Sequence, residues 1–539
     1  MICNYCTEDG HYLSEEDFIF NVKWKVRELK SQGFTNQYIL YFDDCNGWYD
    51  CVKSYLESYC FELKQNIMNE TTTIDYDWLT RSTGDPFADV GGYVIKYLSE
   101  KQPEKDILGL IEYMAKIYVN RWEGKINPFF LNSAITQPAF KGDVKIKETI
   151  KYFSSLINET AVYEEGYCRI TGRKTKLFKA GRDNSLMSGS GTFVNFHHNF
   201  QLGMMLSKEM IIRMFFVPFG SIFIGGRIAI IQSNQMEVND FFVKKNCDSN
   251  IANIATLTSE GVLKSEFGIP SNALFHFVDD LFTNQIETVI DKTKELSLTL
   301  YHFTNFGASP EIVIYKLPST IFKFYSTCQD LKLKSDWQFF LLSHYTNSKF
   351  KGAKYNMTTL NYELTRKEKT EQVEFNDYKI WRNIVLENLL NGKSILRLFV
   401  NWGVKHPFNF TIVELYQKYV QNMKQETLTK IKELALFLTN ADEDAIKKSI
   451  KALDGYKSAY ELRRFFLKNV VAQNYKNGAK DPIITMEELV YYLFPDDVSW
   501  RDIRDILLFA IYQELHAKNI KVEAELSSND TDDIEKLEN

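Results

Sequence analysis

The sequence predicts an α+β protein of several domains, in which a mixed α/β core precedes an all-α helical bundle. Three observations lead to this prediction. The chain has 539 residues, which is too long for one typical hydrophobic core. Its middle part alternates short apolar runs with turn residues, as strands do. From residue 377 onward, apolar residues recur with the helical period, and Gly, Asn or Asp separates the runs.

The expected domains follow changes in composition along the chain. Residues 1–75 form a cysteine-containing N-terminal module, and residues 76–342 form the mixed α/β core. Residues 343–376 are polar and poorly periodic, which indicates a linker or mobile loop that lets the two halves keep their own cores. Residues 377–522 form the helical bundle. Residues 523–539 are acidic with few apolar groups and form a disordered tail.

Within the core, helical periodicity predicts two amphipathic helices over 106–119 and 147–157, and a helix that starts at 93–98. The apolar stretch 210–231 contains Pro218 and Gly220, which favours a buried hairpin of strands 211–217 and 221–231. A further strand is expected over 311–317, before Pro318.

The bundle is predicted from a succession of helical patterns with short connections, as a compact antiparallel arrangement requires. The helices expected there span residues 378–390, 411–423, 427–438, 442–453, 459–474, 486–493 and 500–517.

Charge limits the functions that the chain can have. The net charge is -6 and the isoelectric point is near 5.9, whereas a wholly basic nucleic-acid binder carries a strong positive excess. Any contact with nucleic acid must therefore be local, with other subunits of an assembly supplying most of the phosphate neutralisation. The N-terminus lacks the pattern of a signal peptide, and Arg213, Pro218 and Arg227 interrupt the most apolar stretch. We expect a cytoplasmic protein with no membrane partner.

Signatures of catalysis are absent from the sequence. It contains no phosphate-binding G-x-x-x-x-G-K-[ST] loop, no G-x-S-x-G elbow, no H-E-x-x-H zinc helix and no His-Asp dipeptide. We therefore expect a protein that is not an enzyme.

The strongest local charge feature is a run of cations without an acidic residue before Asp183. Thr171-Gly172 marks a turn inside the run, so a hairpin would project the cations from its tip and flanks toward a nucleic acid. The alternative is a solvated hairpin with no ligand. The cations are Arg169, Arg173, Lys174, Lys176, Lys179 and Arg182.

Two neighbouring features add candidate contacts. Ser188 and Ser190 lie in a Gly-rich turn that either touches phosphate or is an ordinary turn. In the segment 192–200, Asn195, His197 and His198 alternate with aromatic residues. Asn and His can hydrogen-bond base edges and Phe can stack on bases, although a half-buried strand has the same pattern.

The N-terminal cysteines are the candidates for a metal site. Cys3 and Cys6 have the C-x-x-C spacing of zinc ligands, and Cys45 with Cys51 would complete a tetrahedral site. Free thiols are the alternative, and no other cofactor is required.

One stretch resembles a known family. Residues 83–91 read Thr-Gly-Asp-Pro-Phe-Ala-Asp-Val-Gly, which is similar to the T-G-[DN]-P-F-x-D-x-G stretch of the large subunit of type I-B CRISPR effector (Cascade) complexes. The run 168–172 resembles the family's central cysteine region, with Thr171 where some relatives have a second cysteine. The motif positions, which we interpret as structural, are Gly84, Asp85, Pro86, Phe87, Asp89 and Gly91.

The resemblance implies a non-catalytic subunit that lies next to the subunit holding the 5′ handle of the guide RNA. Such a subunit inspects the short motif flanking the target in double-stranded DNA (the PAM), helps to open the duplex, and helps to recruit a separate helicase-nuclease. It also contacts the backbone and small subunits, and its helical C-terminal part resembles the small subunit. Base pairing with the guide reads the long target, so the protein needs few contacts of its own.

Two other functions fit the same residues. In the first, a metal-dependent nuclease uses carboxylates such as Asp85 and Asp89 to hold Mg²⁺, although Asp85 is better placed to cap the helix that follows it. In the second, the chain is a scaffold that binds only other proteins through its bundle.

Overall fold

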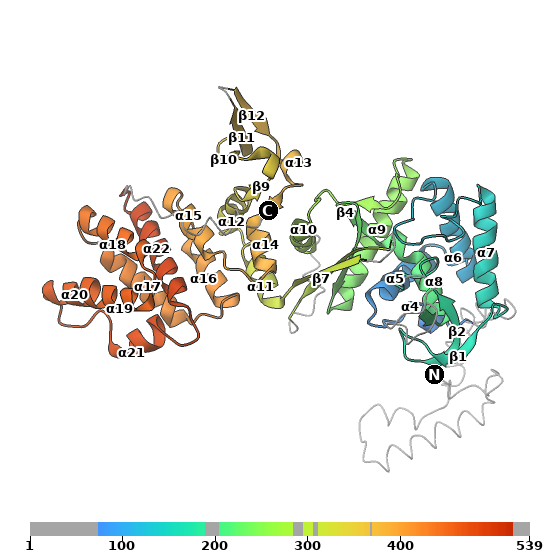
Figure 1. The fold of residues 1–539 in the computed structure, drawn as a ribbon, viewed down its shortest axis with the longest axis horizontal. Coiled ribbons are helices and arrows are strands. Elements are labelled where there is room, and N and C mark those ends of the chain that lie inside the picture. The colour runs from blue at the N-terminus through green and yellow to red at the C-terminus, as the bar shows by residue number, and fades with distance from the viewer. Residues whose placement is uncertain (1–73, 189–203, 284–294, 306–310, 367–368, 521–539) are drawn as a thin grey trace, which may run out of the picture.

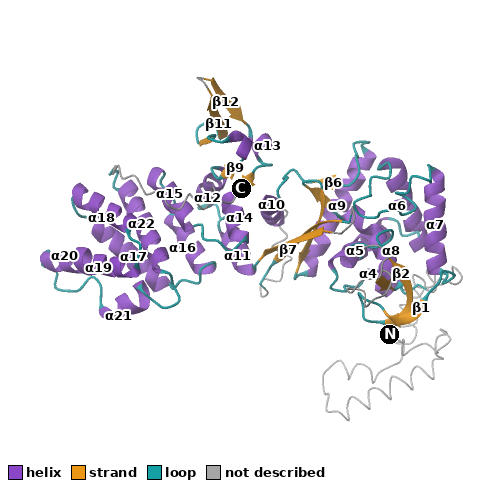
Figure 2. Ribbon diagram, in the orientation of Figure 1, coloured by secondary structure: helices purple, strands orange, loops and turns teal. Residues whose placement is uncertain are grey.

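The computed structural model describes residues 74–188, 204–283, 295–305, 311–366 and 369–520. These residues form an elongated molecule, with the N-terminal α/β part at one end, a sheet in the middle and a helical bundle at the other end (Figure 1). A small β arm projects from the middle. Helices predominate and the strands gather in small sheets (Figure 2), which confirms the predicted fold class.

The N-terminal part is built around the helices α5 (Pro86–Lys101) and α8 (Lys208–Gly220), which pack closely along their lengths. The helix predicted over 106–119 is present as α6 (Ile107–Lys116) continued by the π-helical turn η1 (Ile117–Arg121). The helix predicted over 147–157 is present as α7 (Asp143–Ile157). The other helices of this part are α4 (Tyr76–Thr80) and α9 (Met236–Ala255). The helix α10 (Pro270–Thr283) lies on the other side of the sheet, in the core that continues into the bundle.

The structure corrects the predicted hairpin over 211–231. Its first half is the helix α8, and only the second half forms a hairpin, of β4 (Ile222–Ile224) and β5 (Arg227–Ser233). Every residue of α8 is buried, so no polar face marks the helical period. An apolar run of this length is compatible with a buried helix or a buried strand, and packing against α5 decides the outcome.

A sheet of five strands separates two hydrophobic cores. Its order is β6-β4-β5-β7-β8, antiparallel except where β4 pairs with β6. On β5, Ile228 and Ile230 belong to the N-terminal core, whereas Ala229 and Ile231 belong to the core that continues into the bundle. This follows from the period of two along a strand. The other strands are β6 (Leu263–Lys264), β7 (Leu298–Thr304) and β8 (Glu311–Leu317). The strand predicted over 311–317 is therefore confirmed.

A smaller sheet carries the cationic run. The strands β1 (Glu164–Tyr167) and β2 (Lys174–Ala180) form an antiparallel hairpin, and β3 (Met204–Leu206) pairs with the other edge of β2. Gly172 has a φ of 65°, a left-handed conformation that glycine adopts without strain. The predicted turn at Thr171-Gly172 is thus confirmed.

The interpretation of 343–376 as a linker or mobile loop is wrong. This segment forms the β arm, a three-stranded antiparallel sheet above a paired base, and aromatic side chains give it a core of its own. Tyr362 and Tyr378 are buried there among other rings. Apolar and polar residues alternate only weakly along these short polar strands, so the sequence pattern did not reveal them. The arm consists of β9 (Tyr345–Thr346), η4 (Ser348–Phe350), β10 (Lys354–Asn356), β11 (Asn361–Arg366), β12 (Lys369–Val373), α13 (Phe375–Tyr378) and β13 (Arg382–Asn383).

The C-terminal bundle agrees with the helical patterns in the sequence. Its elements are α14 (Ile384–Leu390), α15 (Leu396–Lys405), α16 (Phe410–Tyr419), α17 (Gln425–Leu438), α18 (Glu443–Gly455), α19 (Ala459–Phe465), η5 (Phe466–Val471), α20 (Ala472–Lys476), α21 (Met486–Glu488), η6 (Leu489–Leu493) and α22 (Trp500–Ala517). The sequence pattern missed α15, whose Gly403 is needed because a Cβ atom there would meet the Phe509 ring at 2.7 Å.

The bundle does not have a core separate from the preceding part. The helices α11 (Ser319–Thr327) and α12 (Lys334–Leu342) lie before the β arm in sequence but pack inside the bundle. Trp337 of α12, for example, contacts Phe399 of α15. The expectation that the two halves keep their own cores is therefore wrong. None of the helices in the described ranges is long and apolar enough to span a membrane.

Candidate nucleic-acid interface

The 83–91 stretch builds the start of α5. The carboxylate of Asp85 accepts hydrogen bonds from the backbone N–H groups of Phe87 (3.0 Å) and Ala88 (2.8 Å), and Pro86 occupies the first helical turn. This is the N-cap that the sequence predicted. The Phe87 ring lies edge-on to that of Phe303 on β7, with centroids 4.9 Å apart. Burial raises the pKa of Asp85 above its ordinary value.

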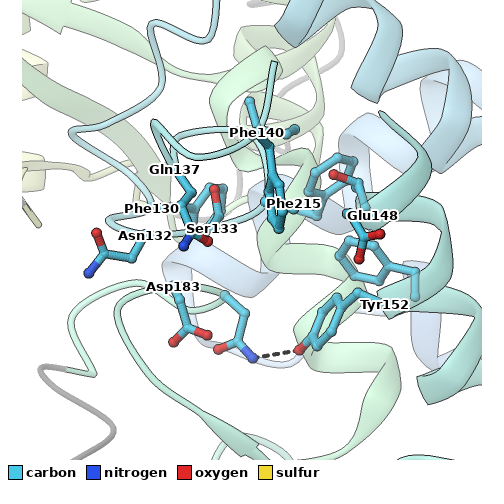
Figure 3. Close-up of a pocket in the computed structure, with 14 residues that line it drawn as sticks. Phe130, Asn132, Ser133, Gln137, Phe140, Glu148, Tyr152, Asp183 and Phe215 are labelled. Carbon is cyan, nitrogen blue, oxygen red and sulfur yellow. Dashed lines mark hydrogen bonds between the residues drawn. The ribbon is translucent and has the colours of Figure 1, made fainter. Parts of the chain in front are cut away.

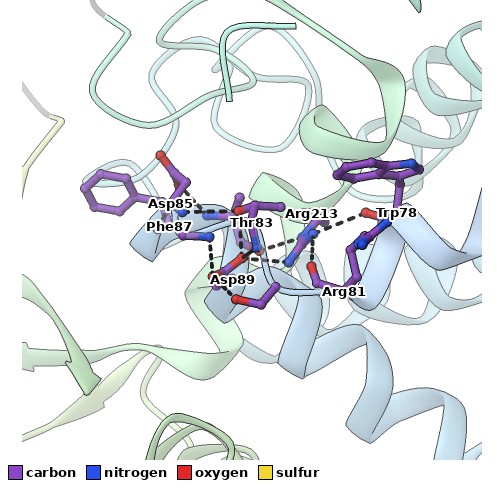
Figure 4. Close-up of polar contacts among 10 residues, drawn as sticks. Trp78, Arg81, Thr83, Asp85, Phe87, Asp89 and Arg213 are labelled. Carbon is purple, nitrogen blue, oxygen red and sulfur yellow. Dashed lines mark hydrogen bonds and ion pairs between the residues drawn. The ribbon is translucent and has the colours of Figure 1, made fainter. Parts of the chain in front are cut away.

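Asp89 joins this turn to a buried arginine (Figure 4). Its carboxylate accepts hydrogen bonds from the backbone N–H groups of Thr83 and Gly84, and from the Thr83 hydroxyl. It also pairs with the guanidinium of Arg213 at 3.1 Å. Arg213 is 0% exposed, and donates further bonds to the carbonyl oxygens of Ala88 and Arg81. The buried guanidinium of Arg213 thus has a carboxylate partner and hydrogen bonds to backbone carbonyl oxygens, as a buried charge requires.

Two glycines in α5 allow Arg213 of α8 to pack directly against this helix. A Cβ atom on Gly91 would lie 1.9 Å from the backbone oxygen of Arg213, and one on Gly92 would lie 2.4 Å from the guanidinium. Gly84 has a φ of 84° in the turn before the helix. In this structure the Asp85 carboxylate accepts hydrogen bonds from backbone N–H groups, and the Asp89 carboxylate pairs with Arg213. Among the described residues, no group of three or more His, Cys, Asp or Glu side chains is arranged to hold a metal ion.

The hairpin presents only part of its cationic run to solvent. Arg173 forms ion pairs with Asp75 (2.8 Å) and Glu209 (3.2 Å), and its guanidinium lies 4.8 Å from the centroid of the Trp78 ring. Lys176 forms an ion pair with Glu159, which raises the pKa of that lysine. Arg173 and Lys176 therefore hold the hairpin against the helices behind it. The prediction that every cation of the run projects outward is wrong for these two residues.

The other cations of the run have different positions. Lys174 and Lys179 are exposed on β2, and Arg182 is half-buried in the turn after that strand. Arg169 lies exposed in the turn of the hairpin, where its backbone N–H donates to the Met205 carbonyl. Nucleic-acid contact by these residues stays a prediction.

Several predicted site residues cannot be placed on this surface. Ser188 is buried, with 1% of its surface exposed, and therefore does not face a phosphate at the surface. Ser190, Asn195, His197 and His198 lie outside the described residues, as do Cys3, Cys6, Cys45 and Cys51. Their roles in reading bases or in binding zinc stay predictions. Cys168, in the run resembling a central cysteine region, is a buried free thiol.

The bundle contributes a surface that the sequence indicated only in part. From α19 through η5 to α20, Tyr460 is 70% exposed and Tyr475 is 82% exposed. Arg464 and Lys468 are exposed between them. Tyr460 and Arg464 are four residues apart in α19, which places them on one helix side, and Lys468 and Tyr475 are exposed farther along the same continuous helical segment. We call these four residues the ring-and-cation face. Arg464 and Lys468 lie in the helix predicted over 459–474, but the exposure of the tyrosines was not predictable from the sequence.

A second helical segment lies beside this one. The guanidinium of Arg463 lies 4.8 Å from the centroid of the Phe494 ring, and Phe466 contacts the same ring. These contacts join η5 to the end of η6, where Tyr491 is 62% exposed. Both segments are π-helical, a geometry that is often found at functional sites.

The comparison with known families concerns this bundle. A family model described as the DevT C-terminal domain matches residues 401–537, a range that begins within α15 and covers the helices that follow it. A search of curated proteins finds no match.

Proposed function

We propose that the chain is a non-catalytic, nucleic-acid-binding large subunit of a type I-B CRISPR surveillance complex. The observation that carries the proposal is the position of the ring-and-cation face inside the region similar to the DevT C-terminal domain. DevT is associated with large subunits of Cascade-type complexes. The T-G-D-P-F-x-D-x-G resemblance at residues 83–91 supports the same assignment from the other half of the chain.

The chemistry of the face suits single-stranded nucleic acid. Exposed aromatic rings stack on bases of any sequence, and neighbouring cations neutralise the backbone phosphates. Tyr460 and Tyr475 supply such rings, and Arg464 and Lys468 supply the cations. A sequence-tolerant surface is what the strand displaced by the guide RNA requires, because base pairing already reads the target.

The hairpin is proposed to contact double-stranded DNA near the flanking motif, through the exposed Lys174 and Lys179. Asn195, His197 and His198 are proposed to read bases there. Guide RNA, the handle-binding and backbone subunits, the small subunit and the helicase-nuclease are the proposed partners. A net charge of -6 suits a subunit that makes few phosphate contacts of its own.

Fluorescence anisotropy of labelled single-stranded DNA across a range of salt concentrations tests the proposal. We expect Tyr460→Ala with Tyr475→Ala to weaken binding at every salt concentration, because stacking is lost. Arg464→Ala with Lys468→Ala should also lower the slope of log K against log salt, by about 0.7 per lost phosphate contact.

The matched control is Lys332→Ala with Lys334→Ala, two exposed lysines at the start of α12. They remove the same charge outside the face and should change binding little. Equal losses for the control and the face variants would contradict a specific surface, and binding of no nucleic acid by the wild-type chain would favour the scaffold alternative.

A further inference from the structure

Two adjoining hollows lie between α7, the loop 130–140 and the end of β2, apart from the ring-and-cation face. The inner hollow has a volume of about 200 Å³ and the outer one about 470 Å³. They share the side chains of Asn132, Tyr152, Asp183 and Asn184. Figure 3 shows Glu148 and Tyr152 on the side of α7, facing the loop residues across the inner hollow. A ligand could therefore occupy both spaces at once.

The walls of the inner hollow are suited to a flat aromatic ring. Phe140, Phe153 and Phe215 line it together with the Tyr152 ring. A cavity on the order of 150 Å³ is sufficient for benzene. The inner hollow therefore has room for a single heterocyclic base, and the sugar and phosphate of a nucleotide would have to remain in the outer hollow.

Polar groups at the rim indicate which bases would fit. Glu148 and Asp183 supply carboxylate acceptors, and Asn132 and Gln137 supply amides. Carboxylates accept hydrogen bonds from exocyclic amino groups such as that of cytosine, and Asn or Gln pairs with adenine. Uracil and thymine have no exocyclic amino group, so they would leave the carboxylates without a donor.

The geometry of the rim is fixed by its own hydrogen bonds. The Asn184 amide donates to the Tyr152 hydroxyl at 2.6 Å and to the Lys179 carbonyl at 3.2 Å, and its oxygen accepts from the backbone N–H of Gly181. Asn132 has a φ of 67°, a left-handed conformation that Asn tolerates. The Tyr152 hydroxyl is thus held in place before a ligand arrives.

The outer hollow adds cations to this arrangement. Lys179 and Arg182 line it, on the side where the phosphate of a nucleotide would lie if its base entered the inner hollow. Aromatic walls, acceptors for amino groups and phosphate-binding cations thus meet at one site.

We propose that these hollows bind one unstacked nucleotide whose base carries an exocyclic amino group, with the base between the aromatic walls and the phosphate at Lys179 and Arg182. This site rests on the proposed function and gives the chain a nucleotide contact outside the bundle. The nucleotide belongs either to RNA or to opened DNA, which share this chemistry.

Calorimetric titration of the full chain with nucleoside monophosphates tests the proposal. We expect CMP, AMP or GMP to bind at least about fivefold more tightly than UMP, the ratio that one good base contact gives. Glu148→Gln with Asp183→Asn should remove this preference. Lys179→Ala with Arg182→Ala should weaken all four ligands alike. Tighter binding of CMP than of dCMP would identify RNA as the source, and equal binding would admit opened DNA.

Glu237→Gln, an exposed carboxylate in the first turn of α9, is the matched control and should change nothing. Equal binding of UMP and the other three, unaffected by the rim variants, would overturn the inference, as would absence of binding at millimolar concentrations. This failure is distinguishable from failure of the proposed function, because oligonucleotides would still bind the ring-and-cation face.

Discussion

At the scale of single residues, Arg213 organises the N-terminal part. It is one of the largest fully buried side chains, and Asp89 is its carboxylate partner. In the sequence, Arg213 is recognisable only as an interruption of an apolar stretch. The cap at Asp85 was predictable because it depends on neighbours in sequence. The pairing of Asp89 with Arg213 was not, since the two residues are 124 positions apart in the chain and lie on different helices.

Removing the carboxylate partner should be costly. We expect Asp89→Ala to lower the free energy of unfolding by about 3–5 kcal/mol, because an unpaired charge would remain buried. Chemical denaturation measures this. The double variant Asp89→Ala with Arg213→Met should be more stable than the single variant. If the loss of unfolding free energy in the double variant equals the sum of the losses in Asp89→Ala and in Arg213→Met alone, the pair is not coupled.

The close contact between α5 and α8 at Gly91 can be tested by substitution. Gly91→Ala should destabilise the protein, because its Cβ atom would lie 1.9 Å from the Arg213 oxygen. Gly455→Ala in α18 is the matched control, since no atom lies within 4 Å of a Cβ there, and alanine favours a helix by about 1 kcal/mol. Thermal unfolding should separate the two variants, and equal melting temperatures would contradict the packing described.

Asp279 provides a pH-dependent test. Burial raises its pKa from 3.8 to about 7, and the charge of Asp280 acts in the same direction, while a hydrogen bond from the Tyr325 hydroxyl and the charge of Lys334 act in the opposite direction. The folded chain therefore binds a proton that the unfolded chain releases. This contribution to stability is fully present below about pH 3.8 and is lost as the pH rises through about 7.

We therefore expect Asp279→Asn to gain stability relative to wild type between pH 5 and about pH 8, measured by urea denaturation at each pH. Asp77→Asn, which removes an exposed ion pair with Arg81, should show no such relative gain. If the difference in unfolding free energy between wild type and Asp279→Asn does not vary with pH, the raised pKa of Asp279 is contradicted.

At the scale of elements, sequence patterns were informative where one side of an element faces water. The helices of the bundle have such a side, and so they were predicted, with α17 and α22 nearly at their observed limits. The fully buried α8 has no polar side, and the strands of the β arm have little apolar alternation. The candidate site shows the same limit, because charge identified Lys174 and Lys176 but could not tell exposed lysines from paired ones.

The β1–β2 hairpin gives a prediction that separates these roles. Lys174→Ala with Lys179→Ala should weaken DNA binding by the assembled complex and flatten its salt dependence, without changing stability. Lys176→Ala removes the ion pair with Glu159 and should affect DNA binding less. Electrophoretic mobility shifts at several salt concentrations compare the variants. A larger loss of affinity for Lys176→Ala would reverse the assignment of these lysines.

At the scale of the whole molecule, one sheet connects the part with the family-like motif to the bundle. Alternate residues of β5 enter the two cores, and α11 and α12 precede the β arm yet pack with α15 and α16. Composition suggested separate halves, because a polar arm in sequence resembles a linker. The described structure instead holds the hairpin, the nucleotide-sized hollows and the ring-and-cation face on one connected framework.

The proposed function places this framework inside a guide-RNA complex. The most direct test is to purify the full chain by an affinity tag from cells that express it with its neighbouring genes, then sequence the bound RNA and identify the bound proteins. We expect short RNAs that share a repeat-derived 5′ handle, together with a repeated backbone subunit. Recovery of the folded chain without such RNA and without a backbone subunit, although both are made in the cell, would contradict the proposed function.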